Sequence, residues 1–177
     1  MENLSKSEIT ALLHVARHNE QHQAFILFAY HHAARRGELL NLRGTDVANG
    51  HVRIVRLKQR KNPIINVQPL AENECALVER LAASAGEGRL FPWSMSYASR
   101  LVKHYLLAAG IYTFPRQKSL HSLRHSAGDT LYRATKDIMA VKTWLGHRSV
   151  ASSQRYVHPN QIELNVLAAN ALALPPS

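Results

Sequence analysis

The spacing of five polar residues near the end of the chain constrains its fold and chemistry more than any other feature. His121, Arg124 and His125 stand at positions i, i+3 and i+4, so a helix would place all three side chains on one face. His147 follows, and Tyr156 comes nine residues after it. A phenol beside fixed cations can attack a phosphodiester, because the cations stabilise the charge that develops on the phosphate oxygens.

The length and composition predict one globular domain. A chain of 177 residues with 46% hydrophobic residues can bury one good core, and a second domain is not expected. No apolar run is long enough to span a membrane, and the first residues lack the basic start and apolar core of a signal peptide. The single cysteine, Cys75, excludes an internal disulfide and fits a reducing compartment, so we expect a cytoplasmic protein.

Positive charge is concentrated in two blocks of the chain. The formal net charge is +10, and residues 35–61 hold eight Lys or Arg against two acidic residues. Residues 100–155 hold ten Lys or Arg, again against two acidic residues. Because these blocks also contain the polar motifs, the pattern favours a specific site for a polyanion over general solubility.

Hydrophobic periodicity and turn signals predict a mostly helical α+β fold with a small antiparallel sheet. Asn49-Gly50 is a strong hairpin signal, and the alternating stretch 51–57 is typical of a strand. Its expected partner is 63–67, with a basic turn at 58–62 between them. Helices are expected at 6–18, 21–33, 35–42, 71–84, 94–109, 120–134, 136–145 and 160–173.

The polar motifs together resemble the catalytic domain of the tyrosine recombinases, the phage integrase family. That family carries a His-x-x-Arg-His box, a Leu-Gly-His box and a tyrosine nine residues later, and this chain matches all three in order. Its first box, roughly Thr-Gly-x-Arg-x-x-Glu-Leu-Leu-x-Leu, is matched by residues 32–42, with His32-Ala33 in place of Thr-Gly. The resemblance covers about residues 5–160.

The resemblance assigns a role to each matched residue. Arg35 and Arg124 would grip the non-bridging oxygens of the scissile phosphate with forked donors. His121 would donate to the same phosphate or assist proton transfer, and His147 would donate to it. Tyr156 would be the nucleophile that forms a 3′-phosphotyrosine. Ionising a phenol at neutral pH costs about 4 kcal/mol, and we expect Arg35, Arg124 and His147 to reduce that cost.

Two further roles follow from the same resemblance. Lys58, in the basic turn, would be the general acid that protonates the leaving 5′ oxygen, with Lys61 as the second choice. Otherwise Lys58 is a solvated lysine or one that touches the DNA backbone. Glu38 would orient Arg35, with Arg36 as the fallback arginine, and an ordinary ion pair on a helix surface is the alternative.

No metal or cofactor is expected. His121 and His125 have the i, i+4 spacing of a zinc-binding helix, but His14 and His18 share that spacing, and Arg124 beside the first pair would repel a cation. We expect His125 to pack against or orient its neighbours instead. The phosphotyrosine bond conserves the energy of the phosphodiester, so the resemblance implies no nucleotide cofactor.

The resemblance also implies partners. We expect a single catalytic domain over residues 1–177, without the family's N-terminal core-binding domain, that binds double-stranded DNA weakly and in a salt-sensitive way. A homotetramer on DNA and a monomer in free solution are expected, in the nucleoid of a bacterium or its phage and not at a membrane. The apolar helix 160–173 would pack either on a neighbouring protomer or on its own domain.

Two other functions use the same scaffold. One is a DNA-binding module without catalysis, which the presence of the whole set of site residues argues against. The other is an enzyme like the type IB topoisomerases, which would relax DNA by the same chemistry without a partner site.

Overall fold

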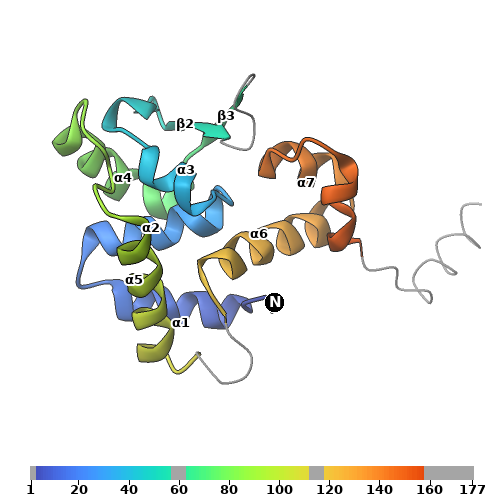
Figure 1. The fold of residues 1–177 in the computed structure, drawn as a ribbon, viewed down its shortest axis with the longest axis horizontal. Helices are drawn as coiled ribbons and strands as arrows, with labels where there is room; N and C mark the ends of the chain where they lie inside the picture. Colours follow the sequence, from blue (N-terminus) through green and yellow to red (C-terminus); the bar gives the residue numbers. More distant parts are fainter. Residues whose placement is uncertain (1–2, 57–62, 112–117, 158–177) are drawn as a thin grey trace, which may run out of the picture.

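A computed structural model describes residues 3–56, 63–111 and 118–157 as a set of helices with a small sheet along one side (Figure 1). The strands are β1 (Val47–Ala48), β2 (His51–Arg56) and β3 (Ile64–Pro69). The α-helices are α1 (Lys6–Ala16), α2 (Glu20–His31), α3 (Arg36–Asn41), α4 (Glu72–Ala85), α5 (Met95–Ala108), α6 (Leu120–Thr135) and α7 (Ile138–Leu145). The 3₁₀ turns are η1 (Gly44–Asp46), η2 (Val150–Ser152) and η3 (Gln154–Tyr156). The predicted fold class is confirmed.

Local sequence signals set several helix ends as predicted. The Ser5 hydroxyl accepts from the backbone N–H of Glu8, and the Glu8 carboxylate accepts from the backbone N–H of Ser5, which forms the expected capping box of α1. At the other end of the chain, α7 stops at Gly146, whose φ of 63° is the left-handed conformation that glycine adopts without strain.

The sheet is an antiparallel meander with strand order β1-β2-β3. Asn49 and Gly50 both have positive φ, as the tight turn between β1 and β2 requires. The β2–β3 register runs from the His51–Pro69 pair to the Arg56–Ile64 pair. The predicted turn at 58–62, with Lys58 and Lys61, lies outside the described residues, as does the predicted helix 160–173.

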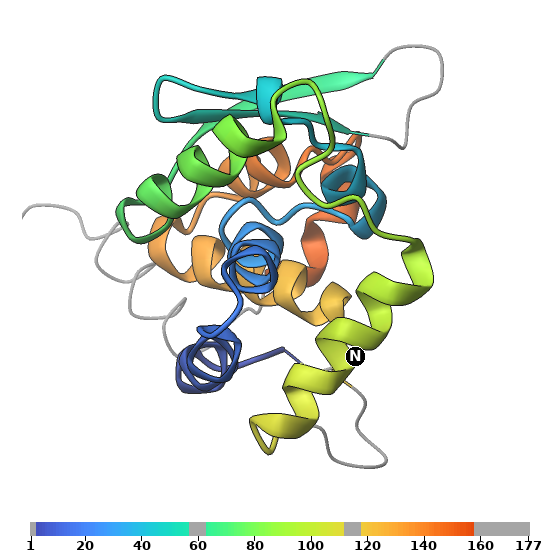
Figure 2. The same ribbon diagram turned by 90° about the vertical axis from the view of Figure 1, so that its left-hand side faces the viewer.

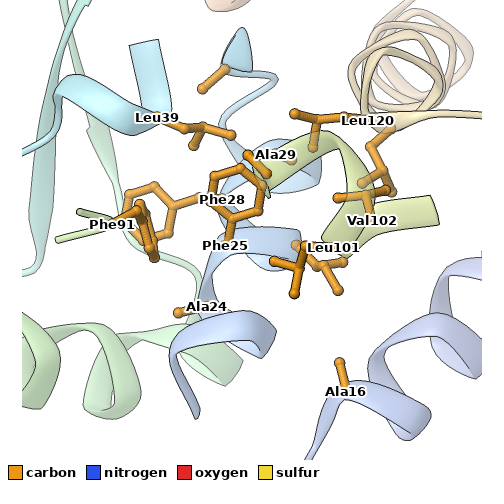
Figure 3. Packing of buried hydrophobic residues seen from close by; sticks show 14 of the residues in the cluster. Ala16, Ala24, Phe25, Phe28, Ala29, Leu39, Phe91, Leu101, Val102 and Leu120 are labelled. Carbon is orange, nitrogen blue, oxygen red and sulfur yellow. The ribbon is translucent and has the colours of Figure 1, made fainter. Parts of the chain in front are cut away.

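Helix α2 runs through the middle of the molecule and packs against α1, α3, α4 and α6 (Figure 2). Its residues from Ala24 to Ala29 are all buried. Phe25 and Phe28 both meet Phe91 edge-to-face, with ring centroids 5.1 and 6.1 Å apart (Figure 3). Fully burying each such ring contributes about 2–3 kcal/mol, so this cluster fixes the helix from which the site residues at 32–35 extend.

The inner face of the sheet is polar where it meets α7. The Asn66 amide on β3 donates to the backbone oxygen of Thr143 at 2.6 Å, and the Gln68 amide donates to that of Trp144 at 2.8 Å. The alternation of β3 therefore turns Ile65 and Val67 outward into solvent. These side-chain bonds hold the last turn of α7 against the sheet and so position the loop that follows it.

A buried ionisable cluster joins α2 to α4. The Glu74 carboxylate lies 2.9 Å from His31 Nδ1 with one oxygen and 2.9 Å from His32 Nε2 with the other. His32 also contacts Gln68 Oε1 at 3.0 Å through Nδ1. Although burial alone would raise it, these hydrogen bonds lower the pKa of Glu74 to about 2. His32 thus replaces the family's threonine with a fully paired side chain.

Within the described ranges, none of the helices has the length and apolar character needed to cross a bilayer.

Candidate active site

Helix α6 carries two of the predicted site residues, His121 and Arg124, together with His125. Its N-cap, Ser119, accepts from the backbone N–H of His121 at 3.3 Å and so fixes the first turn. His121 is exposed, while Arg124 and His125 are buried one turn later. The rings of His121 and His125 meet edge-to-face with centroids 4.5 Å apart, as their spacing predicts.

Arg35 is positioned by the start of α3. One oxygen of Glu38 accepts from the backbone N–H of Arg35 at 2.8 Å, and the other accepts from its guanidinium at 2.8 Å. The same carboxylate therefore caps the helix and holds the side chain, and the predicted contact between Glu38 and Arg35 is present. Arg36 takes a different direction and donates to the hydroxyl of Ser99 on α5.

Arg124 is held at the ends of two helices. It is 2% exposed and donates to the backbone oxygens of Ala33, after α2, and of Leu145, at the end of α7, the latter at 2.8 Å. Carbonyls at helix C-termini carry partial negative charge, which suits a buried cation. Burial, together with the nearby charge of Arg35, lowers the pKa of Arg124 to about 9, so the guanidinium stays charged at neutral pH.

The backbone at Ala33 is in the left-handed region, with φ of 47°. This is the position at which the family's first box has glycine, and an L-residue pays about 1–2 kcal/mol for that conformation. The chain nevertheless turns there in the left-handed conformation, so that the Ala33 carbonyl reaches Arg124 and Arg35 follows two residues later. The replacement of Thr-Gly by His32-Ala33 thus does not prevent this turn.

Arg56 is a member of the site that sequence reasoning missed. It is 1% exposed and donates to Glu38 at 3.0 Å and to the backbone oxygens of His32 and Trp144 at 3.2 and 2.7 Å. Burial lowers the pKa of Arg56, and the charge of Glu38 partly offsets that effect. The missed signal was the alternation of β2, in which Val52, Ile54 and Arg56 share the inward face.

One carboxylate organises these three arginines. Glu38 contacts Arg35 and Arg56 directly, and Arg124 Nη1 lies 4.0 Å from it. Burial opposes ionisation of Glu38, but the charge of Arg56 and the bonds from Arg35 outweigh it and hold its pKa below the ordinary value. Glu38 is therefore ionised and balances only part of the positive charge around it.

Tyr156 lies buried on η3, facing α6. It is 3% exposed, and its phenol oxygen is 3.2 Å from Nδ1 of His125. The ring lies over Gly128, where a Cβ atom would come within 2.6 Å of it. Burial raises the pKa of Tyr156 by more than Arg124, Arg155 and Arg35 lower it. Arg35 and Arg124 thus ease the ionisation as expected, whereas His147 does not contribute, and desolvation outweighs the arginines so that the net pKa is raised.

The two histidines beside Tyr156 are neutral at physiological pH. Burial lowers the pKa of His125 to about 4, helped by His121, and lowers that of His147 to about 4, helped by Arg124. His147 Nδ1 is 2.8 Å from the Ser153 hydroxyl, and its ring is parallel to that of Tyr156. If Ser153 donates to Nδ1, the Nε2–H of His147 is left as a donor.

These side chains line one cavity of about 470 Å³. None of its described lining residues is acidic, so it is a strongly electropositive chamber with the phenol in its wall. Five of the six predicted site residues line it together, and Lys58 lies outside the described residues. The lining residues are Arg35, Arg56, Ile64, His121, Arg124, His125, Gly146, His147, Arg148, Ser149, Ser152, Arg155 and Tyr156.

Such a chamber suits a phosphate ester. Forked guanidinium donors match the non-bridging oxygens of a phosphate, and a buried phenol next to a neutral imidazole can lose its proton to that ring. Among the residues that the structure describes, no cluster of three or more His, Cys, Asp or Glu side chains could hold a metal ion.

Comparisons with known proteins find relatives in sequence. The sequence model of the phage integrase family matches residues 2–163. The Type 1 fimbriae regulatory protein FimE of Escherichia coli K12 is 31% identical over 153 residues, which cover 76% of this chain and 73% of FimE. Tyrosine recombinase XerH of Campylobacter jejuni is 38% identical over 87 residues, which cover 49% of this chain and 24% of XerH.

The fold matches solved structures as well. A XerH site-specific recombinase bound to its difH substrate, in a pre-cleavage complex, superposes with a TM-score of 0.78 at 20% identity. That match covers 96% of this chain and 54% of the XerH chain. This chain therefore spans about half the length of the solved recombinase and most of the length of FimE.

Proposed function

The chain belongs to the phage integrase family, and we propose that it is a site-specific recombinase that cleaves and rejoins DNA through a 3′-phosphotyrosine on Tyr156. The observation that carries the proposal is the phenol of Tyr156, 3.2 Å from a neutral imidazole, in the wall of a cavity lined by arginines. Arg35, Arg56 and Arg124 are brought there by three different parts of the chain, which a structural ion pair does not require.

The scissile phosphate binds between Arg35 and Arg124 in this proposal. Their donors are already oriented, Arg35 by Glu38 and Arg124 by the carbonyls of Ala33 and Leu145, so little reorganisation is needed when charge develops. The Nε2–H of His147 donates to the same phosphate. Ser153 fixes this tautomer by donating to Nδ1. His121 donates from the rim, where it lines the cavity.

Cleavage then exchanges one phosphodiester for another. The phenol oxygen of Tyr156 bonds to phosphorus while the bond from phosphorus to the 5′ oxygen breaks, and Nδ1 of His125 receives the phenol proton. Lys58 gives a proton to the leaving 5′ oxygen. Rejoining is the reverse step, with a 5′ hydroxyl attacking the phosphotyrosine, so neither a nucleotide nor a metal is consumed.

The partner in this proposal is double-stranded DNA, bound by a homotetramer that assembles on it from monomers. The positive lining of the cavity supports binding that depends on backbone phosphates and weakens with salt. The place of action is the nucleoid in the cytoplasm.

The test is covalent trapping. DNA fragments that become linked to the protein are recovered and sequenced. The site found is rebuilt as a duplex with a nick close to the cleavage point, so that the short fragment with the freed 5′ hydroxyl diffuses away and cannot be rejoined. Wild-type protein should accumulate a covalent adduct, and Tyr156→Phe should bind the duplex but form none. Tyr132→Phe, on α6 outside the cavity, is the matched control and should still form it.

The same assay separates the other two functions. A DNA-binding module gives binding without any adduct in the wild type. An enzyme of the type IB topoisomerase kind gives an adduct and also relaxes plasmids that lack the recovered site, which the proposed recombinase does not.

A further inference from the structure

A second cavity of about 320 Å³ lies beside the one that holds Tyr156. The two cavities share Arg35 and His121 as lining residues, so they are adjacent. The second cavity lies where the start of α3, the middle of α5 and the start of α6 come together. Its lining residues are Ala34, Arg35, Arg36, Ser99, Ser119, Leu120 and His121.

The charge of this second cavity comes mainly from Arg36. None of its described lining residues is acidic, and Arg36 is exposed, with the Ser99 hydroxyl as its hydrogen-bond acceptor in the described chain. Arg35, by contrast, is paired with Glu38. The Ser119 hydroxyl adds a neutral donor, whereas the Ser99 hydroxyl already donates to the backbone oxygen of Met95 at 3.2 Å. A guanidinium with a hydroxyl group and no counter-charge is the donor set that binds a phosphate.

The geometry fits a repeating polyanion. Along one strand of duplex DNA a phosphate recurs for about every 3.4 Å of helix axis, so a strand held at Tyr156 must carry its next phosphate into a neighbouring position. Arg35 and Arg36 are consecutive residues whose side chains diverge, one toward Glu38 and the other toward Ser99. These two adjacent residues therefore present two cations to two successive phosphates of one strand.

We propose that the second cavity binds the phosphate next to the scissile one on the same strand, with Arg36 as its principal donor and Ser119 as a secondary donor. The inference rests on the proposed function. Arg36 is then a residue that sets the register of the strand, because a phosphate seated at Arg36 fixes which phosphate reaches Tyr156. Its bond to Ser99 holds the guanidinium over the cavity before DNA binds.

The salt dependence of binding gives a first measurement. Affinity for the nicked duplex is measured over a range of salt for wild type, Arg36→Gln and the control Arg80→Gln. Arg80 is an exposed arginine on α4 that pairs with Glu20 and lines neither cavity. Loss of one phosphate contact should reduce the slope of log affinity against log salt by about 0.9 for Arg36→Gln and leave it unchanged for Arg80→Gln.

A neutral phosphate identifies the contact. Duplexes are made with a single methylphosphonate at the phosphate on either side of the scissile one. For the wild type, one of the two substitutions should weaken binding about tenfold, as the loss of a charged hydrogen bond does. For Arg36→Gln the same substitution should cause no further loss. If each methylphosphonate weakens wild type and Arg36→Gln equally, the proposal is overturned.

Ser99→Ala tests whether Arg36 acts only by joining α3 to α5. It removes the acceptor and keeps the cation, so it should retain the full salt slope. If Ser99→Ala behaves like Arg36→Gln, the role is structural and the subsite is rejected. The covalent adduct of wild type with unmodified duplex is measured first. If wild type forms no adduct, the proposed recombinase function is refuted. If wild type forms the adduct but Arg36→Gln leaves the salt slope unchanged, only the second phosphate site is refuted.

Discussion

Arg56 provides the sharpest test of how this site is held together. We predict that Arg56→Met destabilises the protein by about 3 kcal/mol, the lower end of the range for breaking a buried ion pair. The low end applies because Glu38 keeps its bond to Arg35 at 2.8 Å, and because Gln68 still donates to the carbonyl of Trp144. The carbonyl of His32 loses the donor it has in Arg56. Methionine fills much of the vacated volume.

The destabilisation should also depend on pH. The charge of Arg56 is the largest of the effects that lower the pKa of Glu38, so Arg56→Met raises that pKa. A carboxyl with a depressed folded pKa contributes stability that is present above its unfolded value, near 4.5, and is lost as pH falls through the folded value. The difference between wild type and Arg56→Met should therefore be largest at neutral pH and should shrink below about pH 4.5.

Urea unfolding followed by circular dichroism measures both quantities. The control is Arg53→Met, on the same strand, where the arginine is half exposed and pairs with Asp46, and where the loss should be under about 1 kcal/mol. The reasoning is refuted if Arg56→Met loses no more than Arg53→Met at pH 7, or if its loss is the same at every pH.

Three further outcomes are expected. Ala33→Gly should leave the free energy of unfolding within about 1 kcal/mol of wild type. Ala33→Val should lower it by more than about 2 kcal/mol, because a β-branched residue is strained at positive φ. Equal effects of the two variants in urea unfolding contradict this. Glu74→Gln should lower the free energy of unfolding at pH 7 by on the order of 3 kcal/mol, because the folded pKa near 2 lies below the ordinary 4.5. The variant should also lose less stability than wild type between about pH 4.5 and pH 2. If the urea midpoint of the variant falls over this pH range as steeply as that of wild type, the prediction is wrong. The single-turnover cleavage rate of wild type should be constant from about pH 6 to about pH 9 and should fall toward pH 4, where His125 gains a proton. The rate of His125→Ala should instead rise with pH as Tyr156 ionises. A rate of His125→Ala that does not change with pH excludes His125 as the proton acceptor.

The sequence predicted those features that short-range chemistry determines. The capping box at Ser5 and Glu8, the Asn49-Gly50 turn and the stop of α7 at Gly146 each depend on a few adjacent residues, and all three are present. The i, i+3, i+4 spacing on α6 likewise places its polar residues on one face without knowledge of the rest of the fold.

Features that depend on distant parts of the chain could not be predicted. The alternation of β2 indicates that Arg56 faces inward, but its acceptor on the distant α7, the carbonyl of Trp144 88 residues away, has no signal in the sequence. The direction of the Tyr156 pKa shift depends on how deeply η3 is buried against α6, which no spacing reveals. Arg148 and Arg155 reach the cavity only through the turns that follow α7.

The anchoring of the two buried arginines by main-chain oxygens affects which substitutions this chain can accept. Arg124 and Arg56 are oriented by the carbonyls of residues 32, 33, 144 and 145, and a carbonyl is supplied by any amino acid. Substitutions at these four positions that preserve the path of the backbone keep the acceptors of both guanidinium groups in place. The identity of the residues there is therefore less constrained than the course of the main chain.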